Sequence, residues 1–76
     1  MPKLPRQISG QTLVNVFCKV GYSIDHQTGS HIILWQEKEP HRRLTIPNHQ
    51  EIAPGTLRAI LRQAGLSREE FFALIE

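Results

Sequence analysis

The sequence predicts a small α+β domain in which helices cover one face of a three-stranded antiparallel sheet. Two observations indicate this class. Apolar residues recur at helical spacing near both ends of the chain, and three short strand-like segments lie between them. The turns between these segments are too short to hold a crossover helix, so the strands should pair as an antiparallel meander. The 76 residues suffice for a single domain, 1–76, and residues 1–7, with two prolines, are expected to form a loose arm.

The first helix is expected to begin after Ser9 and to end at Gly21. Ser9 is a residue type favoured at N-caps, and Ile8 and Leu13 have the spacing of a hydrophobic staple. Glycine is favoured just past a helix end because it adopts a positive φ without strain. Helical spacing indicates a buried stripe made of Leu13, Val16, Phe17 and Val20. We also expect Cys18 to lie in the core.

The three strands are predicted at Tyr22–His26, His31–Glu37 and Arg42–Ile46, joined by the turns "QTGS" and "KEPH". Alternation assigns four residues to the face under the helices: Ile32, Leu34, Leu44 and Ile46. In the first strand it places three residues on one face: Tyr22, Ile24 and His26. His31 and Trp35 then lie on the sheet face opposite the helices, which no further segment of this short chain covers.

The second helix is expected between Pro54 and Gly65, because proline is favoured at the first helical position and glycine just past the end. Its buried stripe should comprise Leu57, Ile60, Leu61 and Ala64. Ser67 and Glu70 have the spacing of a capping box and predict a short C-terminal helical extension. The apolar residues of this extension are Phe71, Phe72, Leu74 and Ile75.

Composition excludes several classes of protein. With 39% hydrophobic and 21% charged residues the chain resembles an ordinary soluble domain, and no segment approaches the ~20 apolar residues of a membrane span. The start, "MPKLPRQISG", lacks the apolar region of a signal peptide, so we expect a cytoplasmic protein. One cysteine and the absence of a metal-ligand motif predict neither a disulfide nor a bound metal or cofactor. The net charge of +2 favours an anionic partner only weakly.

The predicted α-β-β-β-α order is that of the double-stranded-RNA-binding fold. Three motifs occur along it: Gly-Ser-His at residues 29–31, Ile-Pro-x-His at 46–49 and Gly-Thr-Leu at 55–57. With the surrounding "GYSIDHQTGSHIILW" and "PGTLRAILRQAGLSREEF", this ordered set resembles the HicA family over most of the chain. The resemblance implies the toxin of a type II toxin–antitoxin system. Such a toxin is an endoribonuclease that cleaves mRNA, stops translation and is held inactive by a HicB-like antitoxin.

The resemblance assigns the catalytic role to His31, presented by the turn of Gly29 and Ser30. His49 matches the later histidine, which could bind phosphate, act as a second acid or base, or cap the loop after Pro47. Without a metal motif, the remaining route uses the 2′-hydroxyl of the RNA against the adjacent phosphate, and histidine suits either proton transfer. The products would carry a 2′,3′-cyclic phosphate and a 5′-hydroxyl, and DNA would be inert.

Basic and aromatic residues are candidates for holding RNA. Arg42 and Arg43, with the turn amides, could stabilise the charge that gathers on phosphorus. Arg58 and Arg62 lie four apart with no acid between them, so their helix face either meets an anion or is simply solvated. Trp35 could stack on a base, anchor the antitoxin or pack under the C-terminal segment.

Two alternatives to the enzyme remain open from the sequence. One is a non-catalytic RNA-binding module of the same fold. The other is a degenerate toxin that acts only as the partner of its antitoxin, because Asp25 and Ile32 depart from the pattern of the family. His26 and His41 lie in or beside turns and are given no role.

Overall fold

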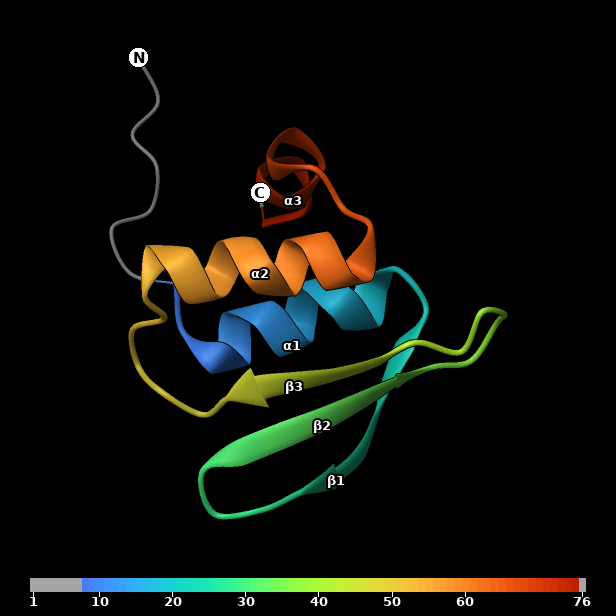
Figure 1. Cartoon of the computed structure of the whole chain (residues 1–76), viewed down its shortest axis with the longest axis horizontal. Helices are drawn as coiled ribbons and strands as arrows, with labels where there is room; N and C mark the ends of the chain where they lie inside the picture. Colours follow the sequence, from blue (N-terminus) through green and yellow to red (C-terminus); the bar gives the residue numbers. More distant parts are fainter. Residues whose placement is uncertain (1–7, 76) are drawn as a thin grey trace.

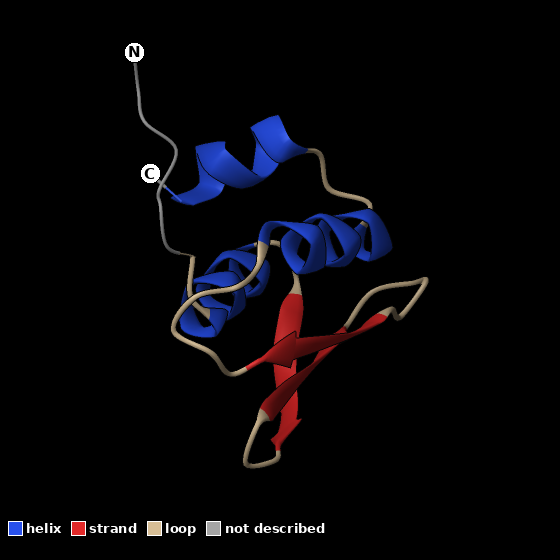
Figure 2. Cartoon of the chain, turned by 60° about the vertical axis from the view of Figure 1, so that its left-hand side comes forward, coloured by secondary structure: helices blue, strands red, loops and turns tan. Residues whose placement is uncertain are grey.

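The computed structural model describes residues 8–75, so the predicted N-terminal arm lies outside the described residues. Six elements follow one another along the chain: α1 (Gly10–Lys19), β1 (Tyr22–Gln27), β2 (His31–Gln36), β3 (Arg43–Pro47), α2 (Pro54–Ala64) and α3 (Arg68–Ile75) (Figure 1). The strands form one antiparallel sheet in the order β1-β2-β3. All three helices lie on one side of this sheet, and none of the described helices covers the other side (Figure 2). The predicted α+β class is confirmed. We call the uncovered side the outer face.

The ends of α1 form as predicted. The Ser9 side chain accepts a hydrogen bond from the amide of Thr12 at 3.0 Å, and Gly21 has φ +100°. Leu13, Val16 and Phe17 are buried, and Val14 joins them. The stripe prediction was wrong for Val20, which is 36% exposed because it is the C-cap and has left the helical conformation. The core prediction was wrong for Cys18, which is exposed because, at about 100° per residue, it lies outside the arc of the helix that holds the buried residues.

The sheet register confirms the predicted core face. Ile32 pairs with Ile46 and Leu34 pairs with Leu44, and all four residues are buried. The third strand starts one residue later than expected, at Arg43, and includes Pro47.

The prediction for the first strand was wrong at His26. The pairing of β1 with β2 shifts between Ile24 and His26, so that Asp25 is an extra residue in the ladder. Ile24 therefore pairs with Leu34, on the core face, while His26 pairs with Ile33 on the outer face. A bulge of this kind reverses the alternation that follows it, and nothing in the apolar pattern marks it. Ile24 is still 52% exposed because β1 is an edge strand.

The C-terminal half confirms the predicted signals. Pro54 begins α2, and Gly65 ends it in the left-handed region at φ 73°. The capping box forms in both directions: the Glu70 amide donates to Ser67 Oγ at 3.0 Å, and the Ser67 amide donates to Glu70 Oε1 at 2.8 Å. The extension is thus a helix, α3, which packs on α1 and places Phe71 in the core with no exposed surface. Within residues 8–75, no helix combines the length and apolar character needed to cross a membrane.

Candidate functional site

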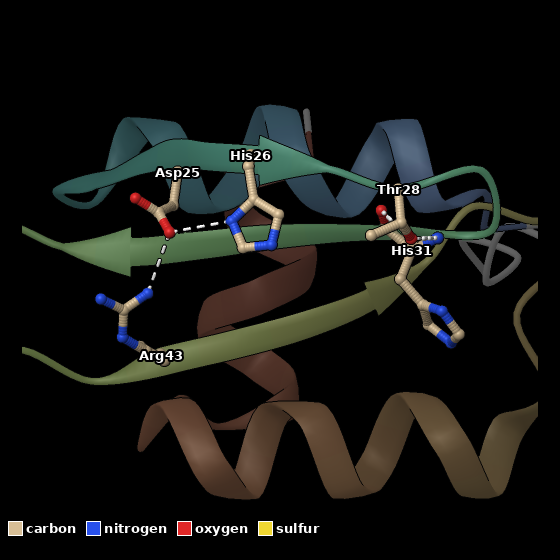
Figure 3. Close-up of polar contacts among 5 residues, drawn as sticks. All are labelled: Asp25, His26, Thr28, His31 and Arg43. Carbon is tan, nitrogen blue, oxygen red and sulfur yellow. Dashed lines mark hydrogen bonds and ion pairs between the residues drawn. The ribbon is translucent and has the colours of Figure 1, made fainter.

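His31 is the first residue of β2, and the turn before it is closed by Thr28. The His31 amide donates to Thr28 Oγ1 at 3.1 Å, and the Thr28 amide donates to the His31 carbonyl at 2.8 Å (Figure 3). The His31 side chain is exposed, and its Nδ1 lies 3.1 Å from Ser30 Oγ, within hydrogen-bond distance. Among the described residues nothing bonds Nε2. The turn therefore fixes the ring through one nitrogen and leaves the other open to a ligand.

The loop after β3 meets this turn. His31 pairs with Pro47, and the Asn48 amide donates to the Ser30 carbonyl at 2.9 Å. The carbonyl of the next residue, His49, accepts from the amide of Gly10 at 2.9 Å. The Gly-Ser-His and Ile-Pro-x-His motifs, 15 or more residues apart in sequence, are thus joined at one end of the sheet.

The imidazole of His49 is exposed and makes no hydrogen bond within residues 8–75. The hydrogen bond that secures its loop comes from the His49 backbone carbonyl. The side chain is therefore available for a ligand, which does not favour the interpretation that it caps the loop.

The start of α2 lies on the same side of the molecule as the β1–β2 turn (Figure 1). Since no side chain caps α2, its partial positive charge faces solvent at this end.

Gly10 lets the loop approach α1 this closely. A β-carbon at residue 10 would overlap the Pro47 carbonyl oxygen and lie 3.3 Å from Asn48 Cα. Gly10→Ala should therefore lower the free energy of unfolding by about 1–3 kcal/mol, as overpacked substitutions do, and slow any reaction at His31. The matched control is Gly55→Ala at the start of α2, where a β-carbon meets open space and should stabilise the helix by about 0.5–1 kcal/mol. Urea unfolding of both variants measures this; equal midpoints would contradict it.

Trp35 lies at the other end of β2, on the outer face. It pairs with Ser23 on one side and Arg43 on the other, and it is half-buried. The ring of His41 stacks on it, with 5.6 Å between centroids and 7° between planes. Phe71 lies in the core on the helix side of the sheet, so Trp35 does not pack under the C-terminal segment. His41, given no role from sequence, is thereby part of an aromatic pair.

Arg43 is held by the bulge residue of β1. Its Nη1 donates to Asp25 Oδ2 at 3.0 Å, and His26 Nδ1 lies 3.0 Å from the same oxygen (Figure 3). The hydrogen bonds with His26 and with Arg43 lower the pKa of the Asp25 carboxyl. Asp25 therefore stays ionised to a lower pH than an ordinary aspartate, and the ion pair persists with it.

The two neighbouring arginines have different environments. A β-carbon on Gly65 would lie 3.6 Å from Arg42 Nη1, so the Arg42 guanidinium sits at the C-terminal end of α2, where cations are favoured. The positive charge of Arg42 also affects Tyr22. Burial raises the pKa of the Tyr22 hydroxyl, and Arg42 partly offsets that rise. Arg42 therefore reaches the helix side of the sheet, whereas Arg43 lies on the outer face.

The structure brings together only part of the predicted site. Gly29, Ser30, His31 and the His49 loop meet at one end of the sheet. Arg43 is four residues away along the ladder, roughly 13 Å at about 3.3 Å per residue. Arg58 and Arg62 are exposed on α2, which packs against β3, and form no ion pair among the described residues.

Sequence reasoning missed Thr28. A threonine at the start of a turn commonly bonds the backbone two or three residues on, which is the signal that could have found it. Within residues 8–75, no three side chains of His, Cys, Asp or Glu gather as they would around a metal ion.

Comparison with known families supplies the remaining observation. A family model described as the HicA toxin of bacterial toxin–antitoxin systems matches residues 10–66, from the start of α1 past the end of α2. The matched segment contains all three motifs, including the turn and the loop that meet at His31. No curated protein matches the chain. Since the match covers most of the sequence, the chain belongs to the HicA family, the toxins of bacterial toxin–antitoxin systems.

Proposed function

We propose that this toxin is a metal-independent endoribonuclease that cleaves mRNA through His31 and so inhibits translation. The observation that carries the proposal is the setting of His31: an exposed imidazole, fixed through Nδ1 by Ser30 and open at Nε2. This histidine lies in the Gly-Ser-His motif within the matched segment. A fixed imidazole with one open nitrogen suits general acid–base catalysis, which requires hydrogen-bond reach to the proton that moves.

The proposed reaction uses only the RNA and side chains of this end of the sheet. A base removes the 2′-hydroxyl proton, the 2′-oxygen attacks the adjacent phosphorus, and the bond from phosphorus to the 5′-oxygen breaks. An acid gives a proton to that departing oxygen. The products are a 2′,3′-cyclic phosphate and a 5′-hydroxyl. His31 performs one of the two proton transfers, and His49, whose loop is hydrogen-bonded to the turn before His31, is the candidate for the other.

The phosphate also needs hydrogen-bond donors, since negative charge gathers on its oxygens during the attack. The amides of Gly29 and Ser30 lie beside His31 and donate no hydrogen bond within the described residues. They are therefore free to bind a phosphate oxygen. Arg58 and Arg62, exposed on α2, would hold the RNA strand through other phosphates. The structure favours these donors over Arg42, whose guanidinium lies at the C-terminal end of α2.

In the cell, we propose that the toxin acts in the cytoplasm and that a HicB-like antitoxin keeps it inactive. The family implies an antitoxin partner in general terms. Because the proposed active site lies open at a turn, a partner protein could block it by covering the turn alone.

The test is incubation of the purified protein with an end-labelled RNA in EDTA, with binding and cleavage measured in the same samples. We expect cleavage, and none of the matching DNA. If RNA binds without being cleaved, the protein would be a non-catalytic binding module and not an enzyme. If the protein neither binds nor cleaves the RNA, the result would support a toxin that acts only as the partner of its antitoxin.

A further inference from the structure

We propose that Trp35, His41 and Arg43 form a subsite for one unpaired nucleotide, at the opposite end of the outer face from His31. The base would stack on the aromatic pair, and its phosphate would bind Arg43. The inference rests on the proposal that RNA is the substrate, and it specifies which RNA: a strand that is single at this position.

The aromatic pair is held in place before any ligand arrives. The backbone of Trp35 is fixed by its register in the central strand of the sheet, and its side chain is half-buried. His41 Nδ1 lies 3.2 Å from the Gln36 carbonyl, and the His41 amide donates to the Lys38 carbonyl at 2.8 Å. Two rings that are already parallel lose little conformational entropy when a third ring adds to them. Since His41 is exposed and Trp35 is half-buried, a base can extend the stack on the imidazole side.

Such a stack selects an unpaired base. In a duplex both faces of each base are covered by the neighbouring pairs, and side chains cannot enter the deep, narrow major groove of A-form RNA. Single-stranded binding surfaces instead place aromatic rings next to a positive charge that follows the phosphates. The outer face has this combination, because Arg43 is the cross-strand neighbour of Trp35. The order of elements is that of a duplex-binding fold, yet this surface fits a single strand.

Asp25 is the competitor for that phosphate. In the structure it holds Arg43 through Nη1, and among the described residues the other guanidinium N–H groups of Arg43 donate no hydrogen bond. A phosphate can therefore use the free donors, but it approaches the Asp25 carboxylate as it does so.

We expect Asp25→Asn to bind RNA more tightly than the wild-type protein. The matched control is Glu69→Gln on α3, which removes an exposed acid on the helix side of the sheet and should leave affinity unchanged.

The chain has a single tryptophan, so its fluorescence reports on Trp35 alone. The probe is a short 2′-O-methyl oligonucleotide of mixed sequence, which cannot be cleaved by its own 2′-oxygen. It is titrated as a single strand and again after annealing to its complement. We expect the single strand to quench the tryptophan as it binds. The duplex should bind more weakly and leave the fluorescence unquenched.

Variants separate stacking from charge. His41→Ala should weaken binding of the single strand roughly five- to 150-fold, the range found when a stacking residue is lost. Arg43→Gln should lower the slope of log affinity against log salt by about 0.7, the value of one phosphate contact on a single strand. Arg68→Gln removes an exposed arginine from α3 and is the charge-matched control. Trp35→Phe keeps an aromatic ring and should bind nearly as the wild type; because this variant has no tryptophan, its affinity is measured by the anisotropy of a dye-labelled oligonucleotide. Circular dichroism checks each fold.

The outcomes distinguish this inference from the proposed function. If RNA is cleaved but duplex and single strand quench equally, or His41→Ala and Arg43→Gln bind as the wild type does, the subsite is overturned and the nuclease stands. If no RNA is bound or cleaved, both fail together.

Discussion

Replacing His31 with alanine is expected to slow RNA cleavage by about 10²- to 10⁴-fold, the usual contribution of one general acid or base. The fold should survive, because the His31 side chain is exposed and its backbone keeps both hydrogen bonds with Thr28. RNA binding should change little, since the turn amides and the arginines remain.

The rates of the two proteins on one labelled RNA measure this effect. His26→Ala is the matched control, because it removes another exposed histidine from the same face, one that contacts Asp25 and not the β1–β2 turn. It should cleave as the wild type does. A His31→Ala protein that is folded and cleaves at the wild-type rate would exclude His31 as the catalytic residue.

Phe71→Ala is expected to lower the free energy of unfolding by about 3–5 kcal/mol, as loss of a buried phenylalanine usually does. Phe71 has no exposed surface, and its ring meets that of Phe72 with 5.2 Å between centroids. It lies in α3, beyond the last residue of the family match at position 66. The large effect would show that α3 is part of the cooperative core, although the family model does not extend to it.

Urea unfolding measures this stability. A total stability of about 5–15 kcal/mol is usual for a domain, so Phe71→Ala could leave too little fold to measure. Phe71→Leu keeps most of the volume and should cost less than about 1.5 kcal/mol. Phe72→Ala, at a half-buried position, should fall between the two. If Phe71→Ala unfolds at the wild-type midpoint, α3 does not belong to the core.

Local signals explain why most of the fold could be predicted from the sequence. The cap at Ser9, the glycine ends at Gly21 and Gly65, and the capping box of Ser67 and Glu70 each act within a few residues. The core face of β2 and β3 followed from simple alternation, which holds there because their ladder is regular.

Apart from Val20 and Cys18 in α1, the features that the sequence did not predict depend on contacts of the sheet and its turns. The bulge at Asp25 is a property of the β1–β2 pairing, and it moved His26 to the outer face. The stack of His41 on Trp35 depends on the conformation of the β2–β3 turn. Arg42 and Arg43 look equivalent in sequence, but Arg42 precedes β3 and lies at the end of α2, whereas Arg43 in β3 contacts Asp25.

The candidate site likewise has features that the sequence could predict and features that it could not. Motif order was enough to name Gly29, Ser30, His31 and His49, and the backbone hydrogen bond from Asn48 to Ser30 joins the two segments. The sequence could not show that Nδ1 of His31 is held and Nε2 is open, because that depends on the rotamers of two adjacent side chains.

The most direct test of the central claim is to cleave an RNA in EDTA, identify the new ends, and repeat the reaction with a single 2′-deoxy nucleotide at the cleaved position. We expect 2′,3′-cyclic phosphate and 5′-hydroxyl ends from the first RNA and no cleavage at that bond in the second. Cleavage of the deoxy-substituted bond, or products with 5′-phosphate ends, would contradict attack by the 2′-hydroxyl with His31 as its proton-transfer group.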